Sequence, residues 1–187
     1  MAISKINAAT ATDNTGMVLL NTTTISSSTA SVIWNSTVIT TTYSDYMTRI
    51  HSYEPVTDGS ALSLYISVDN GSSFVSSNTQ GQLYRRITDS GGNTGLEDFS
   101  ENFVYMGGGL GNDDGEGASF IIDLIGITQA TNKKYITYNN IGKEPTQAYM
   151  WNGGAMINTT SAINYVKLIS SSGNITQGTF SLYGMNR

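Results

Sequence analysis

The C-terminal run, residues 162–185, constrains the fold most strongly because its side chains alternate like those of β-strands. Val166 and Leu168 fall on one face of a first strand, with Tyr, Lys and Ile on the other, and Phe180 and Leu182 alternate with polar residues in a second. Successive side chains of a strand point to opposite faces, so this pattern suits a sheet with one face in a core. A polar, glycine-containing turn joins the two segments. We therefore predict a terminal hairpin whose last strand is part of the sheet.

The rest of the chain contains similar short segments separated by turn residues. Further candidate strands are Met17–Leu20, Ala30–Trp34, Thr37–Thr41, Tyr46–Tyr53, Leu62–Val68, Phe120–Ile127, Lys134–Asn139 and Gln147–Trp151. Pro55–Gly59 and Asp69–Gly71 carry the Pro, Asn, Asp and Gly residues of tight reversals. Residues 119–126 are almost continuously apolar, which predicts a strand buried on both sides or near the centre of a sandwich.

The segment from residue 76 to residue 117 is the hardest to interpret. Gln82–Thr88 fits a short strand or a helical turn, and Leu96–Phe103 fits one turn of helix. Nowhere does a helical apolar period persist beyond about two turns. About nine or ten short strands predict an all-β protein, an antiparallel β-sandwich of the jelly-roll type. We expect residues 1–16 to be an arm or attachment segment and residues 17–187 to be a single β-sandwich domain.

Composition excludes several classes of function. Charged residues make up 12% of the chain, its net charge is −5 and its basic residues are dispersed, which argues against nucleic acid as a partner. There is no cysteine, so disulfides and thiolate metal sites are excluded. The first residues lack the apolar core of a secretory signal, and the apolar run at residues 17–20 is too short to span a bilayer, so we expect no membrane insertion.

The residues that could support catalysis form no recognisable constellation. His51 is the only histidine, it lies in an alternating strand, and no Gly-X-Ser-X-Gly sequence occurs. We therefore expect His51 to be a hydrogen-bonded residue of the sheet. Asp98, Glu101, Asp123 and Glu144 could supply paired carboxylates for glycosidic cleavage, but the sequence contains no information on their separation. The prediction is that the chain is not an enzyme and carries no cofactor.

Residues 107–117 combine glycines with carboxylates. Asp113, Asp114 and Glu116 could supply oxygen ligands to calcium, although the EF-hand spacing is absent. We favour a solvated loop without metal over a calcium site.

Aromatic side chains offer another kind of site. Trp151 and Tyr149 lie beside Asn152, the first residue of an expected Asn-Gly-Gly turn. Exposed rings next to amides are suited to sugars, whereas the same rings also serve as core or interface anchors. We name Trp151, Tyr149 and Asn152 as the candidate ligand-binding residues.

Three segments resemble, in this order, virion proteins of the tail-fibre, head-fibre and capsid-decoration type from marine and cyanobacterial phages. The segments are Tyr43–Met47 with Pro55–Gly59, then Leu62–Phe74, then Thr160–Asn164 continuing through Ser171–Asn174 to Phe180–Gly184. Counted from Met17, the resemblance covers nearly the whole chain, and it transfers no catalytic residue.

The resemblance implies a jelly-roll module on a virus particle that is assembled in the host cytoplasm, with other virion proteins as partners and commonly a homotrimer. The leading hypothesis is a non-enzymatic virion structural protein on a tail or head fibre that contacts the host surface, with a host-surface glycan as a candidate ligand. Trp151, Tyr149 and the loop at residues 107–117 would then be its exposed contact points. An alternative is a capsid decoration or cement protein that stabilises the head, with residues 1–16 clamping neighbouring subunits. A polysaccharide-degrading enzyme is the weakest alternative.

Overall fold

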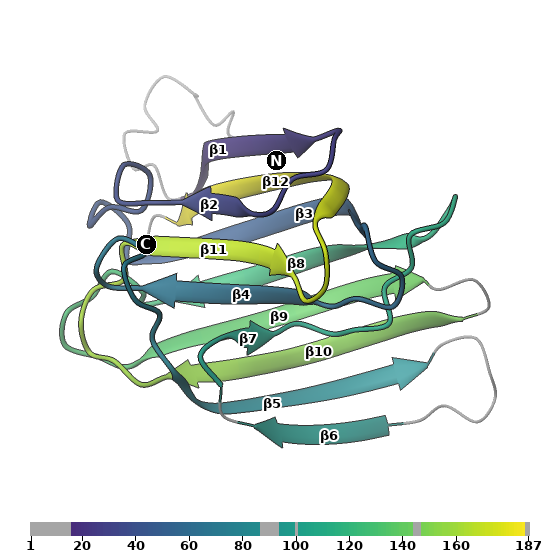
Figure 1. Cartoon of the computed structure of the whole chain (residues 1–187). Helices are drawn as coiled ribbons and strands as arrows, with labels where there is room; N and C mark the ends of the chain where they lie inside the picture. Colours follow the sequence, from purple (N-terminus) through teal and green to yellow (C-terminus); the bar gives the residue numbers. More distant parts are fainter. Residues whose placement is uncertain (1–15, 87–93, 100, 144–146, 186–187) are drawn as a thin grey trace, which may run out of the picture.

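The chain folds into two antiparallel β-sheets packed face to face (Figure 1), and the computed structural model describes residues 16–86, 94–99, 101–143 and 147–185. Eight strands form the large sheet: β1 (Met17–Ile25), β3 (Asp45–Pro55), β5 (Ser77–Arg86), β6 (Thr94–Phe99), β8 (Gly117–Ile125), β9 (Lys134–Lys143), β10 (Ala148–Ile157) and β12 (Ile175–Met185). Four form the small sheet: β2 (Val32–Trp34), β4 (Leu62–Ser67), β7 (Val104–Tyr105) and β11 (Tyr165–Ser170). The prediction of an all-β sandwich is confirmed, with more strands than the sequence indicated.

The strand order is that of a jelly roll. The large sheet begins β1-β12-β3-β8 and the small sheet runs β2-β11-β4-β7, so the first and last strands pair and successive strands pass between the sheets. Two further hairpins, β9-β10 and β5-β6, continue the large sheet beyond β8. Figure 1 shows these added strands extending past the edge of the small sheet. The large sheet is therefore a wide surface, of which the small sheet covers one face.

The predicted terminal hairpin is wrong in its pairing, although both strands exist. β11 pairs with β2 and β4, whereas β12 pairs with β1 and β3 in the other sheet. The turn between them therefore crosses the sandwich. This crossing lets both strands turn their apolar faces, Val166 and Leu168 on one and Phe180 and Leu182 on the other, into a shared core.

One hydrophobic core fills the space between the sheets. Trp34, Tyr46, Tyr53, Phe120 and Phe180 are among its largest fully buried side chains. The Tyr53 ring meets those of Phe120 and Phe180 edge to face, with centroids 5.9 and 6.5 Å apart. Such contacts join strands of the large sheet that lie on either side of β3.

The strand predicted at Thr37–Thr41 is wrong. The backbone N–H groups of Val38 and Ile39 both donate to the carbonyl of Asn35, at 2.9 Å each, which closes a turn. The Asn35 side chain accepts a further bond from the Thr37 N–H at 3.0 Å. This local Asx interaction competes successfully with strand pairing, so the β-branched residues do not extend β2.

The helical turn expected within Leu96–Phe103 is also wrong, because residues 94–99 form β6 and pair with β5. Residues 82–86 of the segment Gln82–Thr88 form part of β5, which settles its ambiguity in favour of a strand for that portion. Pairing of β6 with β5, and of β5 with β10, decides both segments.

The Asn-Gly-Gly turn expected after Trp151 is wrong as well, since Asn152, Gly153 and Gly154 lie inside β10 and pair with both β9 and β5. Gly153 stands opposite Tyr138, and a Cβ atom on it would come within 2.4 Å of the Tyr138 hydroxyl oxygen. The glycine here makes room for an aromatic ring on the neighbouring strand rather than a change of direction.

The predicted arm, residues 1–16, lies outside the described residues except for Gly16. Nowhere in the described ranges is there a helix long and apolar enough to cross a bilayer.

Candidate functional site

Trp151, the first candidate ligand-binding residue, is buried. Its side chain is 9% exposed and its ring meets that of Tyr105 edge to face, with centroids 6.4 Å apart. Trp151 points inward because it follows the exposed Met150 in a strand, where successive side chains alternate between faces. The expectation that Trp151 is an exposed sugar platform is therefore wrong, and the core alternative holds for this ring.

Tyr149 shares the inner face with Trp151 and is half-buried against the core. Its hydroxyl donates to Oε1 of Gln147 at 2.5 Å. Asn152 lies on the opposite face of β10, beside Met150, and is half-exposed. Of the three candidates, only Asn152 contributes to the outer surface of the large sheet.

Residues 107–117 were expected to form a solvated loop with exposed contact points, and their first half does not. Gly107 is buried under the Trp151 indole, and a Cβ atom on it would lie 2.6 Å from Trp151 Cγ. The side chain of Asn140 on β9 donates to the Met106 carbonyl at 2.5 Å. Leu110, fully buried, packs beside Gly142. The segment covers the inner face of β9 and β10, and glycine permits that close approach.

The carboxylates of this loop do not gather into a ligand set. Asp113 and Asp114 are exposed, and the Glu116 side chain accepts the backbone N–H of Asp113 at 3.2 Å. Glu54 lies near them, and burial together with the charges of Asp114 and Glu116 raises its pKa. Across the described ranges, no group of three or more His, Asp or Glu side chains is arranged to hold a metal ion. The geometry lends no support to calcium binding by Asp113, Asp114 and Glu116.

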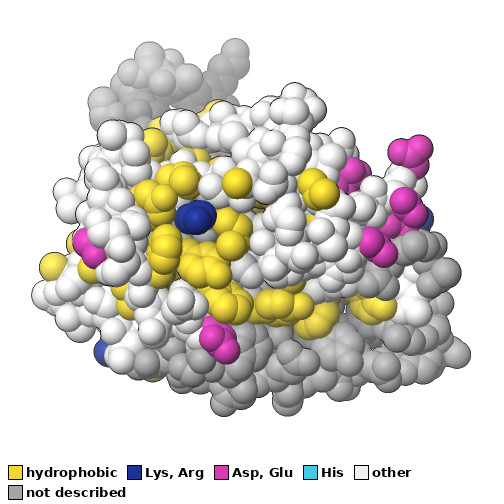
Figure 2. Space-filling view, in the orientation of Figure 1, with side chains coloured by type: hydrophobic (Ala, Val, Ile, Leu, Met, Phe, Trp, Pro, Cys, Tyr) yellow, Lys and Arg dark blue, Asp and Glu magenta, His cyan; other side chains and the backbone are white. Residues whose placement is uncertain are grey.

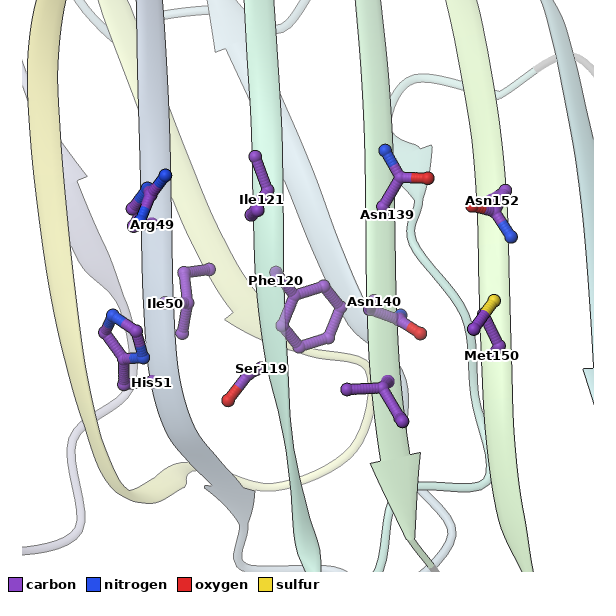
Figure 3. Close-up of a pocket in the computed structure, with 11 residues that line it drawn as sticks. Arg49, Ile50, His51, Ser119, Phe120, Ile121, Asn139, Asn140, Met150 and Asn152 are labelled. Atoms are coloured by element: carbon purple, nitrogen blue, oxygen red, sulfur yellow. The ribbon is translucent and has the colours of Figure 1, made fainter. Parts of the chain in front are cut away.

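The outer face of the large sheet contains a hollow of about 410 Å³ across β3, β8, β9 and β10 (Figure 3). Its outward-pointing side chains form two rows. The first row contains Arg49, Ile121, Asn139 and Asn152, and the second contains His51, Ser119, Ile141 and Met150. Ile50, Phe120 and Asn140 line it from the backbone side. The volume is within the roughly 300–1,000 Å³ typical of small-molecule sites.

Strand alternation and register bring these rows together. Arg49 stands opposite Ile121, Ile121 opposite Asn139, and Asn139 opposite Asn152. Strands are spaced about 4.8 Å apart, so the first row extends about 14 Å from β3 to β10. A bulge in β3 follows, where Ser52 has a φ of 53° and both His51 and Ser52 are exposed. The hollow is therefore built from regularly paired strands and ends at an irregularity.

The outward-pointing polar side chains of the hollow are not engaged by the protein. Within the described part of the chain, the Arg49 guanidinium, the His51 imidazole and the side-chain amides of Asn139 and Asn152 have no hydrogen bond or ion pair. The sequence-based expectation of a hydrogen-bonded His51 is therefore wrong. Between these groups, Ile121, Ile141 and Met150 are 42%, 53% and 39% exposed. Hydrogen-bonding capacity and apolar surface are thus both available to a ligand.

The hollow lacks the contacts of a nucleophilic or general acid–base site. Within the described residues no hydrogen bond joins His51 to Ser119, and no carboxylate orients the imidazole. Asp123 is on the outer face one row away, where the Thr137 hydroxyl donates to it at 3.5 Å. Glu101 is exposed elsewhere on the surface. Glu144 lies outside the described residues, and so does the side chain of Asp98.

A second surface group occupies the outer face of the small sheet, and we call it the aromatic cluster. It consists of Tyr65, Phe74, Phe103, Tyr165 and Lys167. Hydrophobic side chains gather around a basic one over this sheet in Figure 2. The rings are 5.1 to 6.3 Å apart, and the Lys167 ammonium is 5.8 Å from the centre of the Phe74 ring. This cluster is held together by its own members.

The chain matches no family model, no curated protein and no solved structure. The functional argument therefore rests on the residues themselves.

Sequence reasoning missed the hollow, although two signals pointed to it. The almost continuously apolar run of β8 predicts burial on both sides or a place near the centre of the sandwich, but Ile121 is exposed on the outer face. In β9, Asn139 and Ile141 alternate with buried residues, so an amide and an apolar side chain follow each other on the solvent side. Apolar residues on the solvent side of an alternating strand are the signal that could have located the site.

Proposed function

We propose that this chain is a non-enzymatic structural module of a bacteriophage virion, carried on a tail or head fibre, which attaches to the host surface through the hollow on its large sheet. The observation that carries the attachment role is the hollow itself. It presents unengaged Arg, His and Asn side chains between exposed Ile and Met side chains on a rigid sheet. Sites built on strands hold their groups more precisely than sites on loops, which suits recognition.

The virion part of the proposal rests on the sequence resemblance, and the jelly-roll strand order agrees with it. Jelly rolls are frequent in viral coats and lectins, so the fold by itself leaves the role open. The proposed homotrimer has the same basis, and light scattering of the purified chain measures it.

Host-cell binding tests the attachment role. Asn139→Trp would fill the hollow with an indole, whereas Ile33→Trp would add the same group at an exposed site on the small sheet, where Ile33 is 45% exposed. We expect fluorescently labelled wild-type chain and Ile33→Trp to bind host cells and Asn139→Trp to lose binding. Equal binding by all three would rule out the hollow as the attachment surface.

Gold labelling of particles tests the location. Antibodies to the purified chain should label a fibre. Label spread over the capsid lattice would favour the decoration protein instead. Release of reducing ends from host polysaccharide by the purified chain would favour the enzyme.

A further inference from the structure

The charge of the hollow is opposite to that of the whole molecule. The chain has a net charge of −5, yet the residues that line the hollow include the cationic Arg49 and, within the described residues, no carboxylate. Two acidic groups on the surrounding surface have other neighbours: Asp123 accepts from Thr137, and Glu116 lines the adjoining smaller hollow and accepts from the Asp113 N–H. A cationic group without an internal counter-ion favours an anionic ligand.

The opposite end of the hollow offers neutral hydrogen bonding. Asn139 and Asn152 are direct cross-strand partners, so their amides lie side by side, and each offers both donors and an acceptor. Arg49 is two strand spacings from Asn139 along the first row, about 10 Å. A ligand that spans the row therefore needs an anionic group at one end and hydroxyl or amide groups at the other (Figure 3).

The surface between these ends is aliphatic. Ile121, Ile141 and Met150 expose their side chains there, and the phenyl ring of Phe120 beneath them is 2% exposed. An aliphatic surface packs against the C–H face of a sugar ring, whereas bases stack on exposed aromatic rings, which this middle part of the hollow does not offer.

We infer that the hollow formed by Arg49, His51, Asn139 and Asn152 binds a carboxylated saccharide, with the carboxylate on Arg49 and His51 and the sugar hydroxyls on the two amides. This inference rests on the proposed attachment function, because it names the ligand class of the same site. The aliphatic side chains lie under the sugar ring, and Arg49 provides the discrimination between acidic and neutral sugars.

The test is an NMR titration of the ¹⁵N-labelled full chain. The acidic ligands are glucuronic, galacturonic and N-acetylneuraminic acids, and glucose and galactose are the neutral counterparts. We expect at least one acidic sugar to shift the side-chain amide signals of Asn139 and Asn152, and its neutral counterpart to bind at least about tenfold more weakly. Arg49→Gln should weaken binding of the acidic sugar by about tenfold or more. Lys167→Gln removes one positive charge from the small sheet and should leave binding unchanged.

Four results would overturn the inference: no acidic sugar shifts these signals, neutral sugars bind equally well, inorganic phosphate or acetate binds as tightly as the sugars, or Arg49→Gln binds like the wild type. Self-association through the hollow would overturn it too, and would appear in light scattering as an oligomer that Asn139→Trp disperses. If the Arg49→Gln variant still binds host cells, the acidic ligand is refuted but attachment through the hollow is not. If the Asn139→Trp variant still binds host cells, attachment through the hollow is refuted.

Discussion

The two outer faces of the sandwich contain similar chemical groups and use them differently. On the small sheet, Lys167 lies over the Phe74 ring and the neighbouring rings pack on one another. On the large sheet, Arg49 lies beside exposed Ile121, and neither its guanidinium nor the side-chain amides of Asn139 and Asn152 have a protein partner within the described residues. Side chains that contact one another on a surface contribute to the stability of the fold. Side chains without a protein partner can make their hydrogen bonds and apolar contacts with a ligand instead.

The difference arises from a segment that folds back over the small sheet. Asp69–Ser72 forms a turn in which Asn70 and Gly71 both have positive φ, and Val75 then donates to the Ile66 carbonyl at 3.0 Å. This returns Phe74 to the sheet, where it meets Tyr65. The hollow on the large sheet has no equivalent cover among the described residues, and its apolar side chains remain exposed.

The largest expected effect is a difference in stability between substitutions at two neighbouring asparagines, which lie on opposite faces of β9. Asn140 donates to the Met106 carbonyl and accepts the Trp151 N–H at 3.2 Å, so Asn140→Ala leaves two buried backbone groups without these bonds. We expect a loss of about 2–4 kcal/mol in the free energy of unfolding. Asn139→Ala, on the hollow, should change it by less than about 0.5 kcal/mol. Urea unfolding measures both. A large loss for Asn139→Ala would mean that its amide is engaged in solution.

The next effect compares the two faces directly. Tyr65→Ala removes the ring that contacts both Phe74 and Phe103, and this half-buried side chain should cost about 2 kcal/mol. Ile141→Ala, at a side chain 53% exposed, should cost less than about 1 kcal/mol. Denaturant unfolding at two protein concentrations is the measurement. Equal costs, with a concentration dependence for Ile141→Ala, would show that the hollow is covered by a second copy.

A third prediction concerns the core that both faces share. Burial raises the pKa of Tyr53 from 10.0 to about 12. Above pH 10 the unfolded phenol loses its proton while the folded one retains it, so the free energy of unfolding falls as pH rises. The loss should be about 1–1.5 kcal/mol at pH 11 relative to pH 9. Tyr53→Phe lacks this contribution and serves as the control. Tyr65→Ala and Arg49→Gln should both retain it, since neither changes the surroundings of Tyr53.

The smallest effect concerns the turn that covers the small sheet. The Asp69 carboxylate accepts from the hydroxyls of Ser67 and Ser73, each at 2.6 Å, and these bonds lower its pKa from 3.8 to about 2. The folded state therefore favours the ionised carboxylate. That stabilisation is complete above pH 4 and is lost as pH falls through 2. The difference in unfolding free energy between wild type and Asp69→Asn should shrink from pH 5 to pH 2. A constant difference would mean that these bonds are absent in solution.

Much of the fold was accessible from local pattern. Alternation located β3, β4, β9, β11 and β12, and the turn residues located both the Pro55–Gly59 and the Asp69–Gly71 reversals, with positive φ at Gly59 and Gly71. The errors arose where a local turn, or a side chain from a neighbouring strand, overrides the pattern of the segment. Asn35 captures the segment after β2 in a turn, and Gly153 remains in a strand because Tyr138 needs the space.

The candidate site was less accessible, since strand alternation assigns residues to two faces without saying which is buried. Trp151 and Asn152 are adjacent, and the more conspicuous ring faces inward. Lys134 gives a second example. It is fully buried, and its ammonium donates to the carbonyls of Gln129, Asn132 and Thr160, with burial lowering its pKa. No local pattern distinguishes it from its neighbour Lys133, which donates to Asn158 at the surface.

The order of polar and apolar residues along the chain is enough to make it an all-β protein, because the two-residue period of a strand is a local property of the backbone. The division of those strands between two sheets, the burial of Trp151 and the alignment of Arg49, Asn139 and Asn152 into one hollow depend on pairing between segments far apart in the sequence. Arg49 pairs with Ile121, and Met17 pairs with Met185. Register and sheet membership are set by collective burial of the core, and that quantity exists only once the whole chain has folded.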